Sequence, residues 1–202
     1  MGAKLEADSK SQAGQESFVL HCLGRKRGGW FLEIGAFHST DLSNTYILET
    51  RYDWSGIAVE LDEARALEYA SKRRAMCHVG NACFVDYRSL LGNANAPDQI
   101  DYLQVDIEPA RQSLKALKAV LSSGYRFSVV TFEHDLYASR GNWFVRARSR
   151  LALRRAGYML VAADVSNGGN PFEDWWVDPA AVLPQALEPF QHKGSDWNDF
   201  YK

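Results

Sequence analysis

The sequence predicts an α/β fold in which a mostly parallel sheet is covered by helices on both faces, a three-layer sandwich. Short apolar segments alternate with longer segments of helical periodicity, which is the pattern of consecutive β-α-β units. Near the C-terminus this alternation stops, and the turn sequence at 166–171, Ser-Asn-Gly-Gly-Asn-Pro, joins two strand-like segments with no helix between them. Strands joined so tightly pair antiparallel. The expected sheet therefore has seven strands and ends in an antiparallel C-terminal hairpin.

The elements can be placed in order along the chain. Apolar residues at helical spacing predict a first helix within an N-terminal segment, 9–24. Strands are expected at 30–34, 56–59, 76–79, 100–105, 127–132, 158–162 and 174–179. The helices between them are expected at 43–52, 62–74, 110–122 and 143–156. We expect one domain over 1–202, with its core in 28–178 and an irregular aromatic tail at 183–202.

Composition and charge limit the classes of function. The chain has 202 residues, of which 46% are hydrophobic, and a formal net charge of −2. This charge gives no overall attraction to nucleic acid or to an anionic membrane, and no apolar run is long enough to span a bilayer. Cys22, Cys77 and Cys83 lack the spacing of a metal site, so reduced thiols are expected. We therefore expect a cytoplasmic enzyme or binding domain without a membrane partner, and leave open whether it forms a homodimer.

The ends of the first two strands carry the first candidate binding residues, because ligands of such sheets bind beyond the carboxyl ends of the strands. Gly35 permits a tight turn and close approach of the backbone, and Glu33 offers a carboxylate to a cationic ligand. Glu60 ends the second strand and is suited to accept hydrogen bonds from both hydroxyls of a ribose, whereas Asp62 is expected to cap the next helix. The loop after Gly35 is neither glycine-rich nor basic, which disfavours a pyrophosphate. S-adenosylmethionine contains adenosine but no phosphate and fits this pattern.

Later strand ends supply the candidate catalytic residues. Asp106 follows the fourth strand, and Glu133 and His134 follow the fifth. His134 is expected to act as general base with Asp106 or Glu133 orienting it, although a purely structural role for His134 is the alternative. The same three residues could instead bind a divalent metal, which we do not expect. Asn81 and Ala82 follow the third strand and could contact an adenine or simply form a turn.

Several segments resemble the FkbM family of methyltransferases. The closest are Phe-Leu-Glu-Ile-Gly-Ala at 31–36, Ser-Asn-Thr-Tyr-Ile-Leu-Glu at 43–49, Trp-Ser-Gly-Ile-Ala-Val-Glu at 54–60, and the segment 100–108. The resemblance implies a Rossmann-like fold, S-adenosylmethionine as methyl donor, and O-methylation of a small molecule, sugar or natural product that carries a hydroxyl. The cofactor contacts expected from strand ends and resemblance together are Glu33, Gly35, Ala36, Phe37, Ser43, Asn44, Glu60, Leu61, Asn81, Ala82 and Asp106. The chain departs from the family at His38, Ser39, Pro109 and Asp135.

Two other functions remain open. The expected helix 143–156 contains Arg146, Arg148, Arg150, Arg154 and Arg155 and begins with Trp143 and Phe144. Arginine interleaved with aromatics can bind nucleic acid, which would make the protein a nucleic-acid methyltransferase. Given the net negative charge, we favour a solvated helix face and do not expect nucleic acid as a partner. The departures at Pro109 and in the loop after Gly35 suggest the other alternative, a binding domain that keeps the fold without catalysis.

Overall fold

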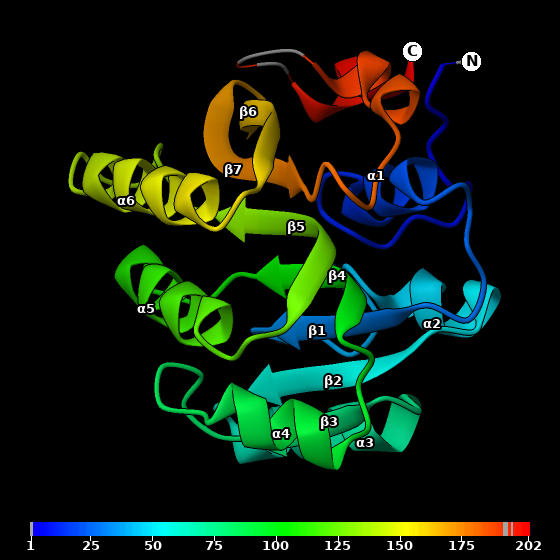
Figure 1. The fold of residues 1–202 in the computed structure, drawn as a ribbon, viewed down its shortest axis with the longest axis vertical. Coiled ribbons are helices and arrows are strands. Elements are labelled where there is room, and N and C mark those ends of the chain that lie inside the picture. Colours follow the sequence, from blue (N-terminus) through cyan, green and yellow to red (C-terminus); the bar gives the residue numbers. More distant parts are fainter. Residues whose placement is uncertain (1, 192–193, 195) are drawn as a thin grey trace.

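One seven-stranded sheet forms the centre of the protein. The computed structural model describes residues 2–191, 194 and 196–202. Within these residues the strands are β1 (Trp30–Ile34), β2 (Ser55–Glu60), β3 (Met76–Val79), β4 (Gln99–Val105), β5 (Arg126–Glu133), β6 (Met159–Asn167) and β7 (Asn170–Val177). Their order is β3-β2-β1-β4-β5-β7-β6. β7 runs antiparallel to both of its neighbours, β5 and β6, and the other neighbouring pairs are parallel (Figure 1). The predicted fold class, a Rossmann-like mostly parallel sheet with an antiparallel C-terminal hairpin, is confirmed.

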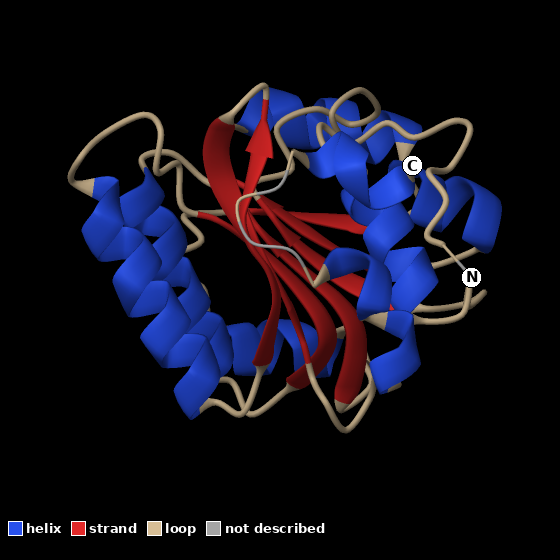
Figure 2. Cartoon of the chain, turned by 90° about the horizontal axis from the view of Figure 1, so that it is seen from above, coloured by secondary structure: helices blue, strands red, loops and turns tan. Residues whose placement is uncertain are grey.

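Helices cover both faces of this sheet (Figure 2). One face carries α1 (Gln15–Cys22), α2 (Tyr46–Tyr52) and α3 (Glu63–Lys72), and the other carries α4 (Tyr87–Asn93), α5 (Ala110–Leu121) and α6 (Asn142–Arg155). The side chain of Asp62 accepts a hydrogen bond from the backbone N–H of Arg65, so the expected helix cap is present. Sequence reasoning did not predict α4, because seven residues with a glycine give too short a periodic pattern.

The C-terminal hairpin is closed by two glycines. Gly168 and Gly169 have φ of 58° and 80°, which is the backbone conformation that a two-residue hairpin turn requires. Trp175 and Trp176 are consecutive on β7, so their side chains enter the cores on opposite faces of the sheet, and both are fully buried.

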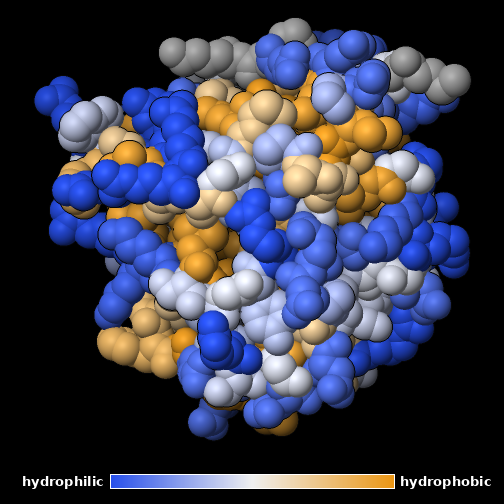
Figure 3. Space-filling view, viewed as in Figure 1, coloured by the Kyte–Doolittle hydropathy of each residue, from blue (hydrophilic) through white to orange (hydrophobic). Residues whose placement is uncertain are grey.

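The segment after β7 packs back on the start of the chain. It contains three 3-10 helices among its described residues: η1 (Pro184–Ala186), η2 (Glu188–Phe190) and η3 (Trp197–Tyr201). Phe190 and Phe200 are buried against Phe18 and Trp175, and the Phe18 and Trp175 rings stack with centroids 4.6 Å apart. Hydrophobic residues, orange in Figure 3, gather on this part of the surface, over α1 and the C-terminal segment. Among the described helices, none combines the length and apolarity needed to cross a membrane.

Candidate active site

A cavity of about 560 Å³ lies at the carboxyl ends of the parallel strands. It adjoins the loops after β1 and β4. These strands are neighbours, and the connections that follow them lead to opposite sides of the sheet. Ligands of open α/β sheets bind at such a point. Of the expected cofactor contacts, the cavity wall includes Glu33, Gly35, Ala36, Phe37, Asn44, Glu60, Leu61, Asn81, Ala82 and Asp106. Ser43 is not part of the wall. Glu133 lines the cavity and His134 does not.

Gly35 brings the β1 loop against the β4 loop. Its φ is +88°, and its backbone N–H donates to the carbonyl of Val59 at 3.0 Å. A Cβ at this position would lie 1.7 Å from the backbone oxygen of Asp106. No side chain fits there, so glycine is required for the two loops to meet at the cavity.

Glu60 stands at the end of β2 with its carboxylate tied to the neighbouring loops. One carboxylate oxygen accepts from the backbone N–H of Phe37 at 3.1 Å, and the other accepts from that of Asp62 at 2.9 Å. Each oxygen keeps further acceptor capacity on the cavity side. The arrangement fixes the carboxylate before any ligand binds, which lowers the entropy cost of binding.

Behind Glu33 lies a buried polar network that sequence reasoning did not find. Oε2 of Glu33 accepts from the Thr45 hydroxyl at 2.8 Å and from the Tyr69 hydroxyl at 3.3 Å. The fully buried guanidinium of Arg73 donates to the Thr45 hydroxyl at 2.9 Å and to that of Ser43 at 3.2 Å. Burial raises the pKa of Glu33, and the charge of Arg73 opposes the rise. Ser43 therefore supports the wall from behind.

Arg73 illustrates why such a network escapes sequence reasoning. It follows the last helical residue of α3 and reads as an ordinary solvated cation at a helix end. Its side chain instead lies over the Tyr69 ring, and Nε is 3.2 Å from a carboxylate oxygen of Glu49. No local sequence pattern predicts that the side chain of Arg73 is buried.

Two amide oxygens in the cavity wall lack partners. Oδ1 of Asn44 and Oε1 of Gln104 are buried and accept no hydrogen bond from the described residues. A buried acceptor left without a donor costs about 1–3 kcal/mol, so a ligand that donates hydrogen bonds would be favoured here. Gln104 was not among the expected contacts. Its signal was present, since it is the polar residue in the apolar run Leu103-Gln104-Val105.

Asp106 and Glu133 form a pair of carboxyl groups at the β4–β5 side of the cavity. Burial raises the pKa of Asp106 to about 6, although a hydrogen bond with Glu133 opposes this, and Asp135 and Glu108 add to the rise. Burial and the charge of Asp106 raise the pKa of Glu133 well above its ordinary value. Two carboxyl groups this close hold a shared proton at pH values where an isolated carboxyl group would be ionised.

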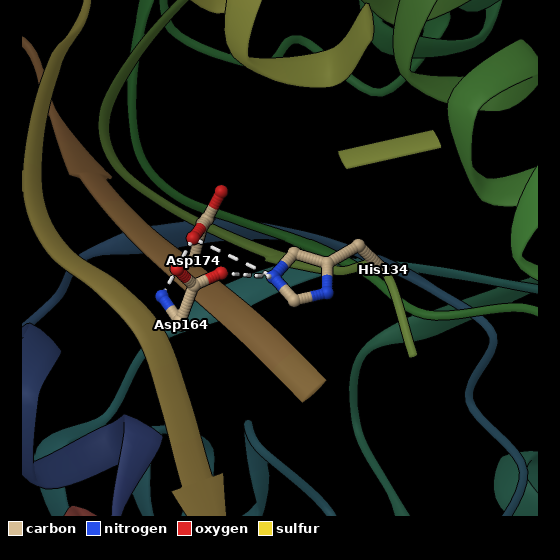
Figure 4. A group of neighbouring side chains, drawn as sticks. All are labelled: His134, Asp164 and Asp174. Carbon is tan, nitrogen blue, oxygen red and sulfur yellow. Dashed lines mark hydrogen bonds and ion pairs between the residues drawn. The ribbon is translucent and has the colours of Figure 1, made fainter. Parts of the chain in front are cut away.

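His134 occupies a different environment from the one expected. It is fully buried, Nδ1 accepts from the backbone N–H of Leu136, and Nε2 lies 3.6 Å from Asp164 and 3.5 Å from Asp174 (Figure 4). Consecutive residues at the end of a strand point to opposite faces, so Glu133 and His134 diverge. The structure thus corrects the expected grouping of Asp106, Glu133 and His134, whether as a catalytic set or as metal ligands.

The group around His134 is an ion-pair cluster on the other side of β5. The possible ligand atoms of His134, Asp164 and Asp174 lie within 4.8 Å of one another. However, a guanidinium nitrogen of Arg150 lies 2.7 Å from both carboxylates, and Arg146 donates to Asp164 at 2.9 Å. Burial would raise the pKa of Asp174, but the hydrogen bonds from Arg150 and the proximity of His134 outweigh it and lower this pKa to about 2. The guanidinium groups already supply the positive charge that a metal ion would bring.

The N-terminal segment completes the cavity wall with Gln12 and Gln15. The buried carboxylate of Glu16 holds this segment by accepting from the backbone N–H groups of Lys10 at 2.7 Å and Ser11 at 3.1 Å. Gln15 also donates to Glu173 at 3.2 Å. Sequence reasoning placed a helix here but did not connect it with the site.

No protein-family model matches the chain, and no curated protein matches it in sequence. Among solved structures, it is similar to an O-methyltransferase from Bacillus cereus in complex with SAH, with a TM-score of 0.58 and 14% identity over 86% of this chain and 84% of that one. It is also similar to the METTL16 methyltransferase domain, with a TM-score of 0.57 and 12% identity over 81% of this chain and 66% of that one. A putative rRNA methylase from Clostridium thermocellum gives a TM-score of 0.57 with 7% identity over 84% of this chain and 96% of that one. The likeness to the FkbM family rests on the sequence segments alone. The chain shares the Rossmann-like fold of class I S-adenosylmethionine-dependent methyltransferases.

Proposed function

We propose that the protein is an S-adenosylmethionine-dependent methyltransferase that methylates a hydroxyl group of a small molecule. The observation that carries the proposal is the cavity at the carboxyl edge of the sheet, in which Glu60 is fixed at the end of β2 and Gly35 lets the β1 and β4 loops meet. The shared methyltransferase fold supports it.

The residues of the cavity fit this cofactor. A volume of about 560 Å³ lies within the range of sites for ligands of this size. Glu60 would hold the ribose hydroxyls, and the unpaired oxygens of Asn44 and Gln104 would accept from the amino-acid part. A cationic ligand beside Glu33 would oppose the rise of its pKa and so favour its carboxylate form. When bound, the cofactor supplies a methyl group on a positively charged sulfur. This sulfur leaves as a neutral thioether when a nucleophile bonds to the methyl carbon.

The Asp106–Glu133 pair replaces His134 as the proposed proton acceptor. A hydroxyl nucleophile must lose its proton as it attacks, and a base whose pKa is raised toward neutrality accepts that proton more readily than an ordinary carboxylate does. Asp106, whose pKa of about 6 leaves it ionised at neutral pH, would take the proton onto a carboxylate oxygen. Glu133, which its raised pKa keeps protonated, would donate a hydrogen bond to Asp106 and orient it.

The charge of the wall indicates what kind of acceptor can approach. Arg65 is the only Lys or Arg among the described residues of the wall. The carboxylates there are Glu33, Glu60, Asp106, Glu108 and Glu133. An acceptor whose reacting end carries phosphate or carboxylate would be repelled, so neutral or cationic hydroxyl compounds are the proposed class.

Calorimetry with S-adenosylhomocysteine, the demethylated cofactor, tests the proposal. We expect the wild type to bind and Glu60→Gln to raise Kd by about tenfold or more, equivalent to about 1.4 kcal/mol. Asp62→Asn is the matched control: it changes the same charge two residues away, and asparagine also caps helices. Failure of the wild type to bind, or an equal loss in both variants, would refute the proposal.

Catalysis is tested separately from binding. Transfer of labelled methyl groups from S-adenosylmethionine is measured with a panel of neutral, cationic and anionic hydroxyl compounds. For an acceptor that reacts, Asp106→Asn should lower kcat by about 10²–10⁴-fold, a much larger effect than its change in the Kd of S-adenosylhomocysteine. Binding without turnover on any compound of the panel would favour the non-catalytic alternative.

A further inference from the structure

The two longest helices on one face of the sheet carry only positive charges. Neither α5 nor α6 contains an aspartate or glutamate. Their cations are Arg111, Lys115, Lys118, Arg146, Arg148, Arg150, Arg154 and Arg155. In a chain with a net charge of −2, this concentration leaves the remainder of the molecule strongly acidic. Sequence reasoning weighed α6 alone and could not see that α5 lies beside it (Figures 1 and 2).

Most of these charges are free. Arg146 and Arg150 point inward and pair with Asp164 and Asp174. The other six are exposed and form no ion pair with the described residues. We call these six the α5–α6 basic face: Arg111, Lys115, Lys118, Arg148, Arg154 and Arg155.

The spacing of the six cations arranges them along the helices. On α5 they lie at intervals of four and three residues, so they form one stripe. On α6, Arg148 and Arg155 are seven residues apart and likewise share a side. Two neighbouring stripes, each about 10 Å long or more at 1.5 Å per residue, give a surface on which several phosphates in a row can lie.

Exposed aromatic side chains stand at one end of this face. Trp143 is 59% exposed, Tyr137 55% and Phe144 45%. Phe84, beside α5, is 74% exposed and has the ammonium of Lys115 3.8 Å from its ring centroid. Ring faces open to solvent next to cations are the surfaces on which unpaired bases stack.

The basic face reaches the cavity. Tyr137 lines the cavity, and so does Gln112, the neighbour of Arg111 on α5. The α5–α6 basic face is positive, whereas the cavity wall is rich in carboxyl groups. A polyanion with neutral planar groups is compatible with both the basic face and the cavity. Its phosphates can contact the cations of α5 and α6 while a base stacks near Tyr137 at the cavity.

We propose that the α5–α6 basic face binds single-stranded nucleic acid, with phosphates on the six cations and bases on Trp143 and Tyr137. The exposed rings beside the cations favour a strand, whose unpaired bases can stack on them, over a flat anionic bilayer. Binding through this face does not depend on the proposed methyl transfer.

Fluorescence anisotropy with the full chain tests this surface. The probes are a fluorescein-labelled 20-nucleotide single-stranded RNA, the DNA of the same sequence, the corresponding duplex, and phosphatidylserine vesicles followed by sedimentation. We expect both single strands to bind more tightly than the duplex, with Kd rising steeply with salt. RNA binding tighter than DNA would identify a contact to the 2′-hydroxyl, and equal binding would identify phosphates and stacking as the whole interaction.

Variants separate charge from stacking. Replacing Arg111, Lys115 and Lys118 together by Gln should raise Kd about tenfold or more and reduce the slope of log Kd against log salt by about 2. Trp143→Ala should raise Kd about fivefold or more with the slope unchanged, and Trp143→Phe should retain most of the affinity. The matched control replaces Lys4, Arg27 and Arg51 by Gln, which removes the same charge from exposed sites away from α5 and α6.

Three results would overturn the proposal. One is the absence of measurable binding of either single strand by the wild type at low salt. The second is an equal loss of affinity in the control variant, which would indicate attraction without a defined site. The third is binding to phosphatidylserine vesicles but not to oligonucleotides, which would make this face a membrane contact. Calorimetry with S-adenosylhomocysteine, run on the same variants, shows whether the cofactor site is intact independently of these outcomes.

Discussion

Buried carboxyl groups in the cavity wall and directly behind it have raised pKa values. Burial raises the pKa of Glu133 well above its ordinary value, and burial raises that of Glu173 to about 8 despite a hydrogen bond from Trp175. A carboxyl group with a raised pKa costs folding free energy wherever the unfolded chain would ionise it. Active sites of enzymes commonly lower the stability of the folded protein in this way.

Removing the ionisable group at Glu133 should therefore stabilise the fold. Between the unfolded and folded pKa values, the folded protein binds more protons than the unfolded chain, so its stability falls as pH rises through this window. Glu133→Gln does not titrate. We expect its Tm at pH 8 to exceed that of the wild type by roughly 2–4 °C, and the difference to vanish as pH is lowered toward 4.

Scanning calorimetry across this pH range measures the effect, with the exposed Glu63→Gln as control. A Tm for Glu133→Gln below that of the wild type at pH 8 would mean that the carboxylate is stabilised in the fold. The raised pKa of Glu133, and with it the proposed hydrogen bond from protonated Glu133 to Asp106, would then be wrong.

Among the elements, the C-terminal hairpin is attached to α6 through buried charge. Arg150 of α6 bonds to Asp174 of β7 through two nitrogens, each at 2.7 Å, and also reaches Asp164 of β6. Asp164 and Asp174 come from different strands, and His134 from the end of β5 closes the group. The cluster thus ties three strands and one helix together.

Removing the central cation should destabilise the fold strongly. Arg150→Ala leaves the fully buried Asp174 without its main partner, and losing one member of a buried pair costs about 3–5 kcal/mol. Arg154→Ala on the same helix removes an exposed cation and should change stability by less than about 0.5 kcal/mol. Urea denaturation of both variants measures the difference.

Equal stabilities for the two variants would show that the cluster is not closed in solution. His134→Ala belongs to the same test. Because His134 faces Asp164 and Asp174 rather than the cavity, we expect this variant to lose stability while its affinity for S-adenosylhomocysteine is retained.

For the molecule as a whole, the two ends of the chain form one unit. The hydroxyl of Tyr201 donates to the carbonyl of Gly14 at 2.7 Å, and Phe190 packs edge-on against Phe18 with ring centroids 4.9 Å apart. The N-terminal segment held in this way supplies Gln12 and Gln15 to the cavity wall. The C-terminal segment therefore supports the site from a distance.

Phe190→Ala should reveal this coupling. The side chain is fully buried, and such truncations cost about 3–5 kcal/mol. Leu183→Ala is the control, since Leu183 is 73% exposed in the same segment and its loss should be nearly neutral. Chemical denaturation gives the stabilities, and calorimetry with S-adenosylhomocysteine shows whether the affinity falls as well. Unchanged stability in Phe190→Ala would mean that the C-terminal segment does not pack as described.

Much of the site could be predicted because its residues follow strand ends. Glu33, Gly35, Glu60, Asn81 and Asp106 were placed from local patterns, and all five line one cavity. The neighbours Glu133 and His134 show the limit of that reasoning. Alternation along a strand implies that only one of them faces the cavity, but not which. The cavity wall also includes Gln12 and Gln15, which lie far away in the sequence.

The sequence by itself determined the fold class, the antiparallel C-terminal hairpin of the sheet, and the edge of the sheet at which the cavity lies. These follow from periodicity and turn chemistry, which act between residues close in the chain. Only the tertiary structure decided that Arg73 is buried behind Glu33, that His134 turns toward the hairpin, and that α5 and α6 join their charges in one face. Each of these depends on contacts between segments distant in sequence, and such contacts form only when the whole sheet has assembled.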